Sequence, residues 1–164
     1  MTDETIFCLE HSLKFIGEQV ADLSDEEMTC QPKGAPNHPA WTLGHVVLSL
    51  QAMAEAAGAK PWLPPDWESR FAYGSVPSST PSGYPSRGSL ISALQDAGIR
   101  LRRAILAADK KNVSGQFPDE EARSIFPTVG HALVQVVVAH TAYHAGQLAS
   151  WRRALSKPPV GVFI

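Results

Sequence analysis

Apolar residues recur at helical spacing near the start of the chain. Five of them follow one another at steps of three, four, three and four, which places them on one stripe of a helix. These residues are Ile6, Leu9, Leu13, Ile16 and Val20. Ser24, followed three residues later by Glu27, has the spacing of a capping box and predicts a short helical turn.

A second helix is predicted over residues 38–57, with Asn37 as its N-cap and Pro39 in its first turn. No residue between positions 33 and 55 carries a formal charge, so this helix is apolar nearly all round. A helix of that kind is expected to be deeply buried.

Residues 58–85 are rich in proline and glycine and show no helical period. A loop of this length within one domain commonly crosses over a bundle or covers a site. Its aromatic residues are expected to pack it against the helices. They are Trp62, Trp67, Phe71, Tyr73 and Tyr84.

A third helix is predicted from Ser86 or Ser89 to about Ala108, and a fourth over residues 128–155, before Pro158 and Pro159. No convincing strand or internal repeat appears. The expected fold is therefore all-α: a four-helix bundle over residues 1–164, in one domain, with a long crossover between its second and third main helices.

Composition narrows the range of partners. The chain has 44% hydrophobic and 18% charged residues and a formal net charge of −2, with its basic residues scattered. This pattern predicts no nucleic acid and no membrane as partner. The acidic start, without an apolar run, predicts no secretory signal and hence a cytoplasmic protein. Cys8 and Cys30 show no metal or redox spacing.

Histidines interrupt the apolar stripe of the fourth predicted helix. His140 and His144 occupy positions that packing would normally give to leucine, and they are four residues apart on one face. Two imidazoles placed in this way can bind one metal ion. His45 likewise replaces an apolar residue on the second helix, and it supplies a third nitrogen if the two helices face each other. Spacing alone leaves open the alternative of three core histidines hydrogen-bonded to carbonyl groups.

The other polar candidates have weaker signals. His131 is predicted to face away from His140, and His38 either begins the second helix or lines the mouth of the site. Ser49 and Gln147 are candidates to support the ligands; the alternatives are a helix-packing serine and a glutamine at the end of the bundle. No residue stands out as a general base: position 55 lies too far along its helix, and the sequence cannot place Asp66 or Glu68.

Two motifs resemble those of the DinB/YfiT-like superfamily. The first is Trp41-Thr42-Leu43-Gly44-His45. The second runs from His140 to Leu148 and continues into Trp151-Arg152-Arg153 and Lys157-Pro158-Pro159. The resemblance in helix order covers nearly the whole chain. It implies a four-helix bundle that holds a divalent metal with His45, His140 and His144.

The resemblance also implies a range of chemistry. Characterised relatives include transferases and isomerases that use low-molecular-weight thiols, and metal-dependent hydrolases, so the expected partner is a small-molecule substrate. The expected cofactor is a divalent metal, zinc first and nickel, iron or copper as alternatives, with a small thiol as a possible cosubstrate. A metal-binding or stress-related bundle without turnover is the alternative function, and a homodimer is possible.

Overall fold

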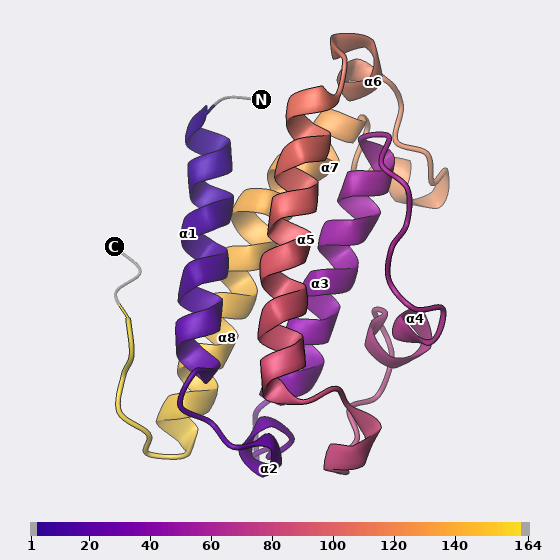
Figure 1. Ribbon diagram of the computed structural model, residues 1–164. Coiled ribbons are helices and arrows are strands. Elements are labelled where there is room, and N and C mark those ends of the chain that lie inside the picture. Colours follow the sequence, from indigo (N-terminus) through magenta and orange to yellow (C-terminus); the bar gives the residue numbers. More distant parts are fainter. Residues whose placement is uncertain (1–2, 162–164) are drawn as a thin grey trace.

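The computed structural model describes residues 3–161 and shows the predicted bundle (Figure 1). Three of its long helices are α1 (Asp3–Val20), α3 (Pro39–Ala56) and α5 (Arg87–Ala107). The fourth is composite, built from α7 (Val129–Val134), the π-helical segment η3 (Gln135–His140) and α8 (Thr141–Ala154). Residues 3–161 contain no β-strand, only an isolated bridge between Gln116 and Thr128. The all-α prediction is confirmed.

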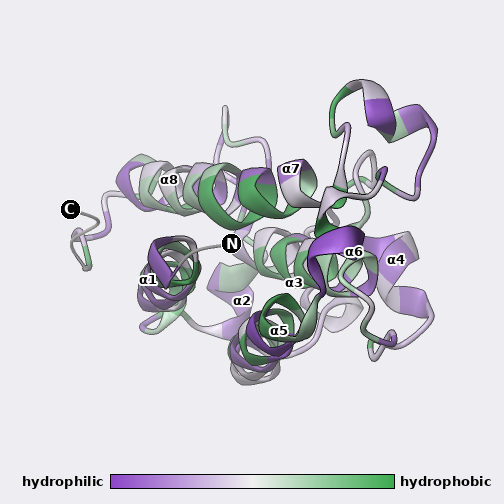
Figure 2. Cartoon of the chain, turned by 90° about the horizontal axis from the view of Figure 1, so that it is seen from above, coloured by the Kyte–Doolittle hydropathy of each residue, from purple (hydrophilic) through white to green (hydrophobic). Residues whose placement is uncertain are grey.

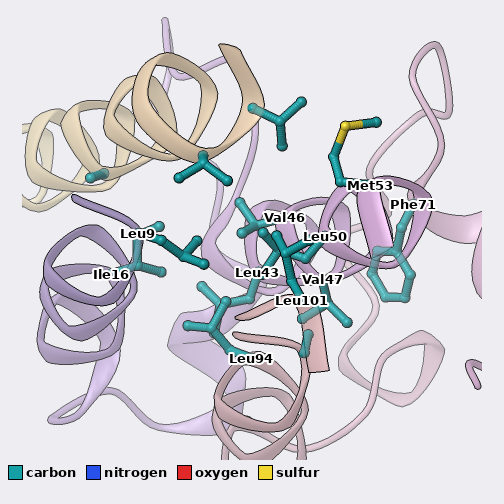
Figure 3. Close-up of a cluster of buried hydrophobic side chains, with 14 of the residues drawn as sticks. Leu9, Ile16, Leu43, Val46, Val47, Leu50, Met53, Phe71, Leu94 and Leu101 are labelled. Atoms are coloured by element: carbon teal, nitrogen blue, oxygen red, sulfur yellow. The ribbon is translucent and has the colours of Figure 1, made fainter. Parts of the chain in front are cut away.

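The four long helices enclose one apolar core. Seen from above in Figure 2, their order around the bundle is α1, α5, α3 and α8, and each packs against both of its neighbours. Leu43, Val47 and Leu50 of α3 have no exposed surface and meet Leu94 and Leu101 of α5 (Figure 3). The prediction that the second main helix is deeply buried is therefore confirmed.

Helix caps set where the elements begin. Ser24 and Glu27 form the predicted capping box at the start of α2 (Asp25–Met28). The predicted N-cap of α3 was wrong by one residue. His38, not Asn37, is the N-cap, because its Nδ1 accepts the backbone N–H of Trp41 at 3.2 Å.

The crossover, residues 58–85, packs along the outer side of α3 (Figure 1). It contains the short helix α4 (Asp66–Phe71) and the 3-10 turn η1 (Pro81–Gly83). Trp67 and Phe71 are buried as predicted, whereas Tyr73 is 97% exposed and does not anchor the segment. The linker between α5 and α7 contains two further short helices, α6 (Lys110–Ser114) and η2 (Glu121–Ser124).

The π-helical segment η3 was not predicted. A π turn accommodates one more residue than an α turn, so it shifts which side chains face the core. Val136 and Val137 lie within the segment and are both buried, His140 is its last residue, and Thr141 follows it. The sequence predicted a regular α-helix because the hydrophobic period on either side of the segment is intact. Wide turns of this type are frequent at functional sites.

The end of α8 is fixed to α1 by a buried arginine. Arg152 is 1% exposed, and its guanidinium donates to both carboxylate oxygens of Asp22, at 2.6 and 2.9 Å. It also donates to the carbonyls of Gln19 and Pro158. Among residues 3–161, none of the helices combines the length and apolar character needed to cross a lipid bilayer.

Candidate metal centre

Three histidines converge between α3 and the composite helix. His45 projects from α3, His140 from the end of η3 and His144 from the first turn of α8. The Nε2 atom of His140 lies 3.2 Å from that of His45 and 3.1 Å from that of His144. One ring nitrogen from each residue lies within 4.8 Å of the others. The three side chains predicted from sequence therefore meet, and the group could bind a metal ion.

The outer nitrogens of two rings are held by acceptors. His45 Nδ1 lies 2.8 Å from the carbonyl oxygen of Phe71, in α4. His144 Nδ1 lies 2.9 Å from Oε1 of Gln147, one turn further along α8. Because a carbonyl or amide oxygen only accepts, each Nδ1 carries the proton and donates it. The Nε2 atoms of His45 and His144 are then left with lone pairs directed toward His140.

The close approach of these nitrogens fits a cation better than it fits three neutral core histidines. A proton on His140 Nε2 can be donated to only one of its two neighbours, so the lone pair of the other neighbour is left without a donor. Two nitrogens bound to one tetrahedral zinc at 2.0–2.1 Å lie about 3.3 Å apart, close to the observed 3.1 and 3.2 Å. His140 Nδ1 is buried and has no hydrogen-bond partner within the described chain.

Burial keeps the three rings neutral. Loss of solvation, together with the neighbouring His140 and His45, lowers the pKa of His144 to about 3. Loss of solvation also lowers the pKa of His140 to about 4, with a contribution from His45. The pKa of His45 is lowered by burial as well. Neutral imidazole is the form that binds a metal ion, so at neutral pH protons do not compete for these nitrogens.

A cavity of about 640 Å³ adjoins the histidine group, with His45 in its wall. Its size is in the range of small-molecule sites. Three carboxylates line it: Glu55 from α3, Glu68 from α4 and Asp119 from the linker before α7. Tyr73 and Phe117 provide its aromatic surface.

The structure separates the other polar candidates. Gln147 contacts a ligand ring, as its hydrogen bond to His144 shows. Ser49 does not, because its hydroxyl donates to the main-chain oxygen of His45 at 2.9 Å, which is a helix-packing contact. Glu68 reaches the cavity, while Asp66 forms an ion pair with Arg70 at 2.6 Å.

The remaining histidines on these helices lie outside the group. His131 is exposed and its Nδ1 lies 2.7 Å from the Thr128 hydroxyl, so it faces away as predicted. His38 has no exposed surface and caps α3, which confirms the helix-start alternative over the mouth of the site.

Two elements of the site had no signal in the sequence. The carbonyl of Phe71 is a main-chain atom, which any residue at that position would offer, so no residue type marks it. Asp119 reaches the cavity only because the linker folds back toward α3. The one available indication was the aromatic content of the crossover, which predicted packing but not the hydrogen bond.

A comparison with protein-family models matched residues 17–148 to the DinB superfamily. The matched region contains all three converging histidines and the whole crossover. No curated protein and no solved structure matched the chain at a significant level. The family model covers well over half of the sequence, and the motifs at the histidine group lie within it, so the chain belongs to the DinB superfamily.

Proposed function

We propose that this protein is a metal-dependent enzyme that activates a small nucleophile, a low-molecular-weight thiol or water, at His45, His140 and His144. The observation that carries the proposal is the convergence of three Nε2 atoms for which residues 3–161 do not supply enough hydrogen-bond donors. Zinc is the expected metal, and nickel, iron and copper also suit three imidazoles.

The three neutral histidines would hold the metal without cancelling its charge. A divalent metal with three neutral ligands lowers the pKa of a thiol or water bound at an open position. The chain's own contribution is to keep the imidazoles unprotonated, by burial, and to fix two of the rings through the Phe71 carbonyl and Gln147.

The cavity beside His45 would bind the electrophilic substrate. With a thiol, the sulfur proton passes to a carboxylate of the cavity wall, and Glu68 is one that α4 places there. The sulfur lone pair then forms the bond to an electrophilic carbon, and the leaving group departs with its bonding electron pair. With water, the same sequence produces hydrolysis.

Elemental analysis combined with activity panels tests the proposal. The purified chain is expected to carry close to one divalent metal ion per molecule, and the loaded protein to turn over in a thiol-conjugation or hydrolase panel. Metal at full occupancy with no activity in either panel would favour a metal-binding bundle without turnover. Absence of metal binding would contradict the proposal itself.

Gln147 provides a first prediction about the ligand shell. In Gln147→Leu, the acceptor for His144 Nδ1–H is lost while the side chain keeps a similar volume. Loss of such a partner typically weakens metal binding by about 10–100-fold, because the ring is no longer fixed in tautomer and orientation. Competition with a chromophoric chelator would measure the affinity. Gln135 is an exposed glutamine on the same composite helix. The variant Gln135→Leu therefore serves as the control and should bind metal like the parent chain.

A further inference from the structure

Three side-chain hydrogen bonds join one face of α3 and its N-cap to the crossover, and the two segments run in opposite directions. As the helix advances from position 38 to 41 to 45, the crossover partners run back from 78 to 75 to 71. The pairs are His38 Nε2 with the Ser78 carbonyl at 2.9 Å, Trp41 Nε1 with the Ser75 hydroxyl at 2.8 Å, and His45 Nδ1 with the Phe71 carbonyl at 2.8 Å. The candidate ligand His45 is therefore the last member of a regular series of contacts.

A glycine permits the closest approach within this series. A Cβ atom at Gly44 would overlap Cδ1 and Cε1 of the Phe71 ring and lie 2.6 Å from its Cγ. Phe71 has no exposed surface, so its ring has no free space to move into. Trp67 makes a second contact between α4 and α3, because its indole N–H donates to the Gly44 carbonyl at 3.0 Å. The absence of a side chain at position 44 thus lets α4 lie directly against α3.

We propose that Gly44, Trp67 and Phe71 form a positioning device that fixes the orientation and tautomer of His45. Docking of the Phe71 ring over Gly44 places the Phe71 carbonyl where it accepts the His45 Nδ1 proton, which directs Nε2 toward His140. Trp41 stacks on the face of the His45 ring: the centroids of the two rings are 4.8 Å apart and their planes differ by 9°. The consequence for metal binding rests on the proposed function; the control of the His45 ring does not.

The same segment also reaches the cavity. Glu68 and Ala72 line it beside His45, within one turn of the Phe71 carbonyl. The device therefore joins the wall that would contact a substrate to the atom that orients a metal ligand. This arrangement explains why a glycine precedes His45 and why two large aromatic residues occupy α4.

Two single substitutions and one double substitution test the device. Gly44→Ala should displace α4, and Trp67→Phe should loosen it more gently by removing one hydrogen bond while keeping an aromatic ring. Gly44→Ala combined with Phe71→Leu removes the clashing ring but retains the main-chain carbonyl at position 71. Gly146→Ala is the matched control, since it also adds a methyl group near a ligand histidine but meets no atom within 4 Å.

The first readout is the tautomer of His45, measured from the ¹⁵N and ¹H shifts of its ring in metal-free protein. The parent chain and Gly146→Ala should show a proton on Nδ1, and Gly44→Ala should show a mixture of tautomers. Where Gly44→Ala does not fold, Trp67→Phe should still show faster exchange of the Nδ1 proton. An unchanged ring signal in a folded Gly44→Ala and in Trp67→Phe would overturn the proposal.

The second readout is zinc affinity. Gly44→Ala should bind zinc at least about tenfold more weakly than Gly146→Ala, as expected when a group that orients a ligand is lost. The double variant should recover most of that loss. Equal affinities of the two alanine variants, or no recovery in the double variant, would count against the device. If the parent chain binds no zinc but Gly44→Ala still changes the tautomer of His45, only the proposed metal function is rejected.

Discussion

Replacing His140 with alanine is expected to weaken divalent metal binding by about 100-fold to 1,000-fold. Structural zinc sites bind with about 10–16 kcal/mol, so one of four ligands contributes about 3–4 kcal/mol. His140 is the central residue, since its Nε2 is the atom that lies close to both other rings. Its Nδ1 has no partner among residues 3–161, so the substitution removes no other hydrogen bond from the protein. Isothermal titration with zinc would measure the change.

His131→Ala is the matched control for this experiment. His131 lies on the same composite helix, is exposed, and interacts with Thr128 rather than with the histidine group. It should bind zinc as the parent chain does, and the helical signal in circular dichroism should be retained in both variants. A folded His140→Ala protein with unchanged zinc affinity would show that the three rings do not share an ion.

Most of the fold follows from periodic patterns in the sequence. The stripe from Ile6 to Val20 predicted α1, and the uncharged stretch around His45 predicted a buried helix. The two histidines four residues apart were recognisable because they interrupt an apolar face. A helical period fixes which residues share a face, so the convergence of His140 and His144 needed no knowledge of the rest of the chain.

The features that could not be predicted depend on the three-dimensional path of the main chain rather than on residue type. The Phe71 carbonyl orients His45 across 26 positions of sequence, and nothing in the residue type marks it. The π-helical turn before His140 is equally hidden, since it leaves the flanking period intact. The need for glycine at position 44 arises from the Phe71 ring, which the fold brings beside it. Each of these features affects the position or orientation of a candidate ligand that the sequence did indicate.

The neutral state of the ligands links metal binding to stability. Burial of His140 and His144 favours the uncharged imidazole, which is the form needed to bind metal. In the metal-free protein the same burial lowers the free energy of unfolding when the solution becomes acidic. The unfolded chain, where the pKa of each histidine is about 6.5, can then take up protons that the folded chain cannot. The protein should therefore be least tolerant of acid when its metal has been removed.

The free energy of unfolding of the metal-free protein is expected to fall as the pH decreases from about 6.5 toward 4. In this window the pKa of His140, about 4, and that of His144, about 3, keep both rings neutral in the folded state. Each such histidine contributes a slope of up to about 1.4 kcal/mol per pH unit. Over this window the two rings together are expected to lose on the order of 5 kcal/mol. Above pH 6.5 the stability contributed by these groups is fully present and the curve should be flat. Urea unfolding at a series of pH values would measure it.

Other titrating groups can be separated from this effect. The pKa of Asp22 is lowered from 3.8, mainly by its hydrogen bond with Arg152, so its contribution is lost only below the pH range of interest. Burial also lowers the pKa of His38, which contributes in the same range. A variant with His140→Ala and His144→Leu keeps His38 and His45, so the difference between its slope and that of the parent chain isolates the contribution of the pair. Saturating zinc should flatten the curve down to about pH 5 and add about 2.7 kcal/mol at 100 times the dissociation constant. A parent chain whose metal-free stability is constant between pH 6.5 and 5 would show that the rings are not buried as neutral imidazoles, and the basis for a metal site would be lost with them.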